Sequence, residues 1–210
     1  MRAWEAGRME AGNLDTPVLS SLNEAFDAAS VGEEENMPLF LCGPSGGLGG
    51  LSYDWRNYSD PTYDLNDLLI LNIFVRHGRL IDYIRFDYQS ISDPNKRYSR
   101  IMGGGGGHNR DAITLERAEV VTRIFGRYGI YVDSISIEKT NIDTGAQNTF
   151  GPFGGPGGSA GFDYRVPLLP TRLPPPYPPP QKGPWADMAI IGLWGGRGIF
   201  VDALGVIMRR

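Results

Sequence analysis

Three aspartates share a local pattern that could bind a ligand rich in hydroxyl groups. Each stands four residues after a glycine, with large apolar residues at the two positions before it and at the second and fourth positions after it. An ionised carboxylate accepts two O–H groups at once, and glycine tolerates the backbone conformations of a tight turn. The pattern therefore predicts three turns that each present one acid: Asp82, Asp133 and Asp202.

A second element, Gly-Gly-x-Gly-Gly, also occurs three times, at 46–50, 103–107 and 154–158. The two elements alternate along the chain, and the intervals from a glycine loop to the next motif aspartate are 32, 26 and 44 residues. The third interval exceeds the second by eighteen residues, which is the length of a proline-rich segment, 167–184. Without this segment the chain consists of three units of about fifty residues, which indicates a threefold internal repeat.

The residues between these elements predict strands. Polar and apolar side chains alternate in Tyr83 to Phe86 and in Ser134 to Ile137, which is typical of strands with one buried face. Each unit then contains a glycine loop, strands, a tight turn and a further strand. Three such units can close three small antiparallel sheets about a pseudo-threefold axis, so the sequence predicts an all-β body.

The composition argues against several classes of protein. The 210 residues have a net charge of −4 and a pI near 5.2, whereas proteins that bind nucleic acid usually carry a basic surface. One cysteine and two histidines give no metal-site spacing, so we expect neither a metal nor another cofactor.

The lengths of the apolar stretches and the residues near Met1 indicate whether to expect membrane insertion or a secretory signal. The apolar stretches are far shorter than the roughly 20 residues of a membrane span, so we expect no membrane insertion. No basic start followed by an apolar run of about 7–15 residues occurs near Met1. We therefore expect no conventional secretory signal, and a cytoplasmic or non-classically released protein.

The charge distribution divides the chain into two parts. Residues 1–36 have a net charge of −6, whereas residues 37–210 have +2, so we expect an acidic N-terminal extension before the main domain. In the extension, Thr16 and Pro17 are typical of an N-cap and a first helical position, and Gly32 would end the helix. This short helix could bind a partner or a second copy of the chain, or it could pack on the main domain.

The proline-rich segment 167–184 contains nine prolines, which cannot donate backbone hydrogen bonds to a sheet. We expect an extended polyproline II loop inserted in the main domain. A ligand for an SH3- or WW-type domain is the alternative, because Arg172 precedes two proline runs.

Three longer stretches carry a family resemblance: GRYGIYVDSIS at 126–136, FGPFGG at 150–155 and VDALGVIM at 201–208. Together they make the stretch from Cys42 to Met208 resemble the jacalin-related lectins of the mannose-specific type. The resemblance implies a β-prism I fold of three four-stranded Greek-key sheets, here with a short N-terminal helical extension. Many members keep the aspartate turn in only one or two sheets. This sequence has it in all three, as in members with three sugar sites per domain.

The resemblance also implies which segments meet. Each sugar site joins one aspartate turn to one glycine loop: Asp82 to 103–107, Asp133 to 154–158 and Asp202 to 46–50. In each site the turn glycine, the two residues after it with their backbone amides, and the last loop glycine are expected to contact the sugar: Gly78, Arg79, Leu80 and Gly107; Gly129, Ile130, Tyr131 and Gly158; Gly198, Ile199, Phe200 and Gly50.

In this family the carboxylate binds the 4- and 6-hydroxyls of mannose or glucose, so an axial 4-hydroxyl fits poorly. Galactose-preferring relatives use a freed N-terminal glycine, whereas Gly46 here lies inside a continuous chain. The expected partners are mannose- or glucose-containing glycans or glycoproteins, bound without metal at up to three sites that act by multivalency. The resemblance leaves homo-oligomer formation open.

The motif residues also allow a purely structural interpretation, in which glycine forms the turn and aspartate bonds to the backbone. The Asp82 site is the one whose function stays most open, because Leu80 lacks the aromatic ring that Tyr131 and Phe200 could pack against a sugar. Two further aspartates, Asp54 and Asp163, are interpreted as structural.

Three arginines flank the turns: Arg76, Arg127 and Arg197. We expect them to be solvated, with contact to sialic acid or sulfate as the alternative.

Catalysis is not expected. A glycosidase needs two carboxyls about 5 to 9.5 Å apart, and each motif supplies one. No nucleophile and base are marked by the sequence either. The alternative to a lectin is a protein-interaction module that uses the N-terminal helix and the proline-rich loop, with degenerate sugar sites.

Overall fold

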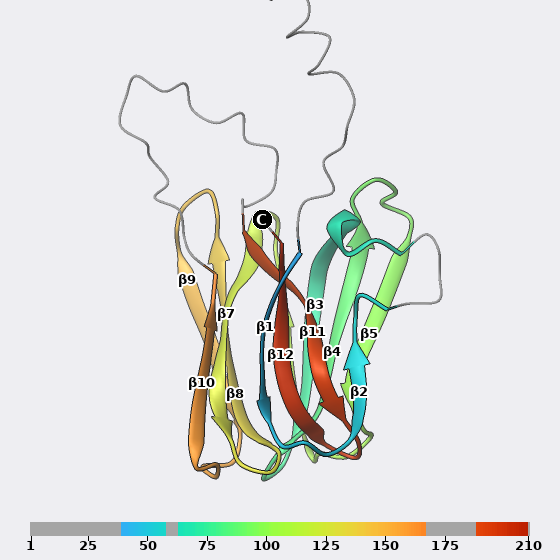
Figure 1. Ribbon diagram of the computed structural model, residues 1–210. Helices are drawn as coiled ribbons and strands as arrows, with labels where there is room; N and C mark the ends of the chain where they lie inside the picture. The colour runs from blue at the N-terminus through green and yellow to red at the C-terminus, as the bar shows by residue number, and fades with distance from the viewer. Residues whose placement is uncertain (1–38, 58–62, 167–187, 210) are drawn as a thin grey trace, which may run out of the picture. The chain divides into compact units, whose positions relative to one another are not determined.

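The alternating segments of the sequence form an all-β structure (Figure 1). It is a computed structural model that describes residues 39–57, 63–166 and 188–209. These residues form twelve strands and one short 3₁₀ helix, η1 (Leu65–Asp67). None of their helices could cross a lipid bilayer. The expected N-terminal helix and the proline-rich loop lie outside the described residues.

Two sheets repeat one strand order, β5-β4-β3-β6 and β9-β8-β7-β10, and all neighbouring strands in them are antiparallel. Three consecutive strands lie side by side and the fourth returns beside the first, which is the Greek-key arrangement. The strands are β3 (Leu68–His77), β4 (Ile81–Ser90), β5 (Arg97–Gly103), β6 (Asn109–Thr114), β7 (Glu119–Tyr128), β8 (Val132–Asn141), β9 (Gln147–Gly154) and β10 (Ala160–Arg165).

The first and last described strands form a third group of four. Its order is β1-β12-β11-β2, which matches the order of the other two sheets. Hydrogen bonding continues from β11 to β7 through the pair Ile190 and Val121, so this group and the second sheet share one ladder. The predicted three four-stranded Greek-key sheets are confirmed, with strands β1 (Leu39–Gly46), β2 (Leu51–Asp54), β11 (Ala189–Arg197) and β12 (Val201–Arg209).

The burial of side chains follows the predicted alternation in β4 but not in β8. In β4, Ile84 and Phe86 are buried while Tyr83 and Arg85 are partly exposed. In β8, all four residues from 134 to 137 are buried, so the prediction of a single buried face is wrong there. Serine is small, and Ser136 has Phe125 of β7 as its register partner, so larger neighbours cover it.

An aromatic cluster forms part of the core between the sheets. Trp55 packs edge-on against Phe86 at a centroid distance of 5.0 Å and against Tyr88 at 6.4 Å, and all three are fully buried. The hydroxyl of Tyr88 donates a 2.9 Å hydrogen bond to the carbonyl of Ile191 on β11. This bond satisfies a buried polar group and ties the sheet of β4 to that of β11.

The strand order brings every aspartate turn and every glycine loop to one end of the sheets, the lower end in Figure 1. In an antiparallel sheet, the connection between the first and second strands lies at the same end as the connection between the third and fourth. The turns join β3 to β4, β7 to β8 and β11 to β12, and the glycine loops join β5 to β6, β9 to β10 and β1 to β2.

Candidate functional site

The three aspartate turns have the same geometry. The amide of the first residue donates to the carbonyl of the third, from Gly78 to Leu80 (3.1 Å), from Gly129 to Tyr131 (2.9 Å) and from Gly198 to Phe200 (3.0 Å). Among the described residues, no hydrogen bond is formed by the amides of the second and third turn residues, which are 79 and 80, 130 and 131, and 199 and 200. Each turn thus presents two backbone donors beside its aspartate.

Each glycine loop contacts the aspartate that the family resemblance implied. The aspartate carbonyl accepts a hydrogen bond from the second loop glycine in all three cases: Gly104 to Asp82 (2.9 Å), Gly155 to Asp133 (3.1 Å) and Gly47 to Asp202 (3.0 Å). We call these assemblies of turn, aspartate and loop the Asp82, Asp133 and Asp202 sites.

The carboxylates lie against loop glycines so closely that no side chain would fit there. A Cβ at Gly106, Gly157 or Gly50 would come closer than 3.0 Å to a carboxylate oxygen of the aspartate in its site. The sequence singled out the last glycine of each loop, but Gly107 and Gly158 pack on the backbone before the turn instead. Gly106 and Gly157 were missed, although the repeat of glycine at this fourth loop position was a usable signal.

The Asp202 carboxylate is buried and incompletely hydrogen bonded. Its side chain is 5% exposed, and its Oδ2 has no hydrogen-bond partner in the described part of the chain. Burial raises the pKa of Asp202 above its ordinary value of 3.8, and a hydrogen bond from its own backbone amide opposes this shift. Gly50 covers this oxygen, so a ligand hydroxyl could supply the missing donor only if the loop moved.

The three sites are packed against one another around the end of the sheets. A Cβ at Gly47, Gly104 or Gly155 would collide with a turn carbonyl of a different site, namely that of Ile130, Ile199 or Arg79 respectively. Tyr131 and Phe200, which were expected to face sugar, contact each other edge-on at 5.3 Å. Their rings therefore join the Asp133 and Asp202 turns.

One hollow of about 710 Å³ connects two of the sites. Asp82 and Asp133 both line it, together with turn residues of the first site and loop residues of the second. In the turns of the Asp133 and Asp202 sites, the second residue is exposed to solvent: Ile130 is 76% and Ile199 is 74% exposed. The rest of the lining consists of Gly78, Arg79, Leu80, Gly107, His108, Gly155, Pro156, Gly157 and Phe200.

The sequence matches the family model of the Jacalin-like lectin domain over residues 42–173, which is more than half of the chain. The chain belongs to the jacalin-like lectin family. This finding confirms the resemblance that the motifs suggested. As a jacalin-like lectin, the chain is a carbohydrate-binding protein and not an enzyme.

Several known proteins align with this lectin over almost their whole length. Horcolin from Hordeum vulgare subsp. vulgare is 27% identical over 165 residues, which are 78% of this chain and 92% of that protein. A Malaysian banana lectin is 23% identical with a TM-score of 0.57, covering 81% of this chain and 98% of the other. AcmJRL, a mannose-binding jacalin-related lectin from Ananas comosus, is 25% identical with a TM-score of 0.54, covering 81% and 97%.

Other charged groups of the lectin have structural partners. Asp163 forms an ion pair with Arg123, whose hydrogen bonds lower the pKa of the Asp163 carboxyl. Burial acts to raise the pKa of Asp54, but hydrogen bonds from Arg56 outweigh it and lower the pKa. Both aspartates thus fit the structural interpretation.

Arg127 is exposed, as expected for a solvated arginine, and it also donates to the carbonyls of Gly157 (3.0 Å) and Gly158 (2.6 Å). Both carbonyls belong to the glycine loop of the Asp133 site. Arg127 therefore stabilises that loop. Arg197 also has a protein partner, because its guanidinium lies 3.8 Å from the centroid of the Tyr53 ring.

Proposed function

We propose that this lectin binds mannose- or glucose-type glycans at up to three sites without a metal ion, and that the sites act together on branched glycans. The observation that carries the proposal is the repeated pairing of a carboxylate with a glycine loop and two turn amides that have no hydrogen bond among the described residues. A hexose needs both acceptors and donors, and each site offers both within one turn.

The carboxylate is the group that would select the sugar. It can accept hydrogen bonds from two adjacent hydroxyls, while the turn amides donate to ring or exocyclic oxygens. A sugar hydroxyl that reached the unpartnered Oδ2 of Asp202 after movement of the loop would give this buried acceptor the donor that it lacks. The preference for mannose or glucose is supported by AcmJRL, which is described as mannose binding.

Metal independence is supported by the composition of the sites. Each site contributes a single carboxylate, whereas bound Ca²⁺ takes about 6–8 oxygen ligands. In the described ranges, no three or more His, Cys, Asp and Glu side chains gather where they could hold a metal ion. The hydrogen-bonding groups named above are sufficient to hold a sugar by themselves.

Multivalency is supported by the shared hollow. An open monosaccharide site with few hydrogen bonds is expected to have a dissociation constant near about 1 mM, or roughly −4 kcal/mol. Asp82 and Asp133 line the same hollow, so two arms of one branched glycan can reach both carboxylates. The second arm then binds intramolecularly, and the gain can reach roughly 10²- to 10⁴-fold.

The test is retention on immobilised mannose, with and without EDTA, for the wild type and for the Asp82→Asn, Asp133→Asn and Asp202→Asn variants and their triple combination. Asp143→Asn is the control, because it removes one charge from an exposed loop residue. Retention should survive EDTA, fall in the single variants and vanish in the triple variant. Loss of binding on chelation, or full retention by the triple variant, would contradict the proposal.

A further inference from the structure

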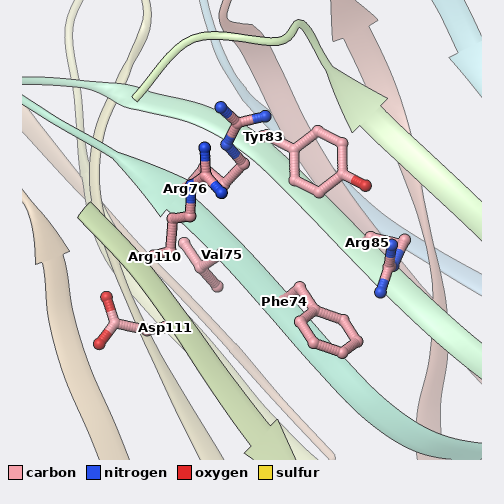
Figure 2. A pocket seen from close by; sticks show the side chains of 7 residues that line it. All are labelled: Phe74, Val75, Arg76, Tyr83, Arg85, Arg110 and Asp111. Carbon is pink, nitrogen blue, oxygen red and sulfur yellow. The ribbon is translucent and has the colours of Figure 1, made fainter. Parts of the chain in front are cut away.

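A second concave region lies on the outer face of the sheet β5-β4-β3-β6, and none of the three motif aspartates lines it. It has a volume of about 260 Å³ and is lined mainly by arginines and aromatic rings (Figure 2). We call it the arginine cleft, defined by Phe74, Arg76, Tyr83, Arg85, Arg110 and Asp111. Its charged groups need an explanation, because the sugar sites described above do not use them.

Two of the arginines of the cleft lie opposite each other. Arg76 on β3 and Arg110 on β6 are direct cross-strand partners, and their side chains lie on the same side of the sheet in Figure 2. Like charges in such a position destabilise a sheet. Within the described residues neither arginine forms an ion pair, and Nε of Arg76 is buried without a hydrogen-bond partner. An anion between the two guanidinium groups would satisfy both.

The other charged groups of the cleft have hydrogen-bonding partners of their own. Arg85 forms an ion pair with Asp87 at 3.0 Å, and its guanidinium lies 4.0 Å from the centroid of the Phe74 ring. The carboxylate of Asp111 is bonded to Nε2 of His77 at 2.9 Å and lies apart from the guanidinium groups in Figure 2. Nδ1 of His77 accepts a hydrogen bond from the amide of Gly154, so the contact between His77 and Asp111 is not an ion pair. Arg76 and Arg110 thus place two positive charges in the cleft against the one negative charge of Asp111.

The wall of the cleft suits a saccharide. Tyr83, the register partner of Arg76 on β4, is only partly buried, and its ring centroid lies 5.8 Å from the Arg76 guanidinium. An exposed aromatic ring beside a cation can pack on the apolar face of a sugar whose acidic group reaches the cation. This aromatic ring beside the cation distinguishes the cleft from a surface that is only basic.

The cleft does not belong to the threefold pattern of the sugar sites. By strand register, Arg76 and Arg110 correspond to Arg127 and Gly161 in the second sheet, and to Gly196 and Ser52 in the third. At this register position, only the first sheet has an arginine on both strands. Arg127 moreover donates to its glycine loop, so it is not available to a ligand in the same way.

We propose that the arginine cleft binds an acidic oligosaccharide through a sulfate ester or a carboxylate held between Arg76 and Arg110, with the sugar ring against Tyr83. Two guanidinium groups can donate parallel hydrogen bonds to either kind of oxyanion. None of the three motif aspartates lines the cleft, so we expect it to act independently of the Asp82 site. The inference therefore does not rest on mannose binding.

The experiment measures binding of three tetrasaccharides by calorimetry at low salt: a sulfated carrageenan fragment, an oligogalacturonate and a neutral agarose fragment. All three have galactose-type backbones, so they do not test the proposed mannose sites. Arg76→Gln/Arg110→Gln should weaken binding of the charged fragments by about tenfold or more, because hydrogen bonds to charged groups are lost. Added salt should weaken wild-type binding.

The controls separate the cleft from net charge and from the sugar sites. Arg117→Gln removes one charge from an exposed residue in the turn between β6 and β7, and it should leave binding of the charged fragments unchanged. Asp82→Asn should also leave that binding unchanged, and the double arginine variant should keep its mannoside binding. The relative affinities of the sulfated and carboxylated fragments show which acid the cleft binds more tightly.

Three results would overturn the proposal. The first is wild-type binding that is no tighter for the charged fragments than for the neutral one. The second is a loss in Arg117→Gln equal to that in the double variant. The third is loss of charged-fragment binding in Asp82→Asn. If only mannose binding failed, the proposal for the arginine cleft would still stand, so the two proposals are distinguishable.

Discussion

Alanine at two glycines would fill space that two of the proposed sugar-binding carboxylates now occupy. A Cβ at Gly106 would lie closer than 3.0 Å to Oδ1 of Asp82, and one at Gly157 would lie closer than 3.0 Å to Oδ1 of Asp133. Neither glycine has a positive φ, so the backbone itself accepts alanine. We expect Gly106→Ala and Gly157→Ala each to disable one site and to leave the fold intact.

The size of the effect follows from this overlap. To restore a separation of 3.0 Å, the Asp82 carboxylate must move by about 0.6 Å, which exceeds the roughly 0.5 Å spread of hydrogen-bond lengths. A sugar hydroxyl held by that oxygen then loses a hydrogen bond to a charged group, at a cost of about 1.5 to 3 kcal/mol. The dissociation constant of the site should rise roughly 10- to 100-fold.

Amide NMR spectra recorded during a titration with methyl α-mannoside measure each site separately. The amide of Leu80 reports on the Asp82 site and that of Tyr131 on the Asp133 site, because both lie in the turns. Gly106→Ala should weaken the response of Leu80 and leave that of Tyr131 in place, and Gly157→Ala should do the reverse. The melting temperature should stay within a few degrees of the wild type in both variants.

Gly105→Ala is the matched control in the same loop. A Cβ at Gly105 has nothing within 4 Å, and the other two loops carry Leu48 and Pro156 at this position. This variant should bind mannoside normally. Unchanged affinity in Gly106→Ala, or an equal loss in Gly105→Ala, would refute the steric reasoning.

Four further expectations test other contacts. On acidification from about pH 7 to about pH 4, the sugar affinity of the Asp202 site should fall at a higher pH than the affinity of a site whose carboxylate has an ordinary pKa. Burial raises the pKa of Asp202, and a protonated carboxyl group has fewer hydrogen-bond acceptors. Site-resolved NMR titrations measure this. Arg127→Gln should weaken only the Asp133 site, several-fold, in the same titrations, since its glycine loop loses two hydrogen bonds. His77→Leu should lower the free energy of unfolding in urea by about 1 to 3 kcal/mol, because the amide of Gly154 loses its acceptor. Trp55→Ala should cost about 3 to 5 kcal/mol in the same assay, because a fully buried ring leaves a cavity.

The fold could be predicted largely from local sequence. The glycine and aspartate spacing of each turn lies within five residues, and a tight turn depends mainly on such local residues. Alternation of apolar residues predicted the strand at 83–86 for the same reason. The single buried face predicted for 134–137 was wrong, because the burial of a serine depends on the neighbouring strand as well as on its own sequence.

The pairing of each turn with its glycine loop came from the family resemblance, since the two elements are about twenty residues or more apart. The structure places them together as expected. The resemblance did not identify the glycine closest to the carboxylate in the first two sites, which is the fourth of the loop. That contact depends on the path of the loop over the turn, which composition does not determine.

By itself the sequence determined the all-β class, the threefold repeat and the three acids, because turns and strand periodicity are encoded in short stretches. Only the tertiary structure decided what surrounds these residues. The register of two strands sets Arg76 opposite Arg110. The packing of two sheets brings Tyr131 to Phe200, and it buries an oxygen of Asp202 that has no hydrogen-bond partner in the described part of the chain. These contacts join residues far apart in the chain, so they depend on how the sheets assemble.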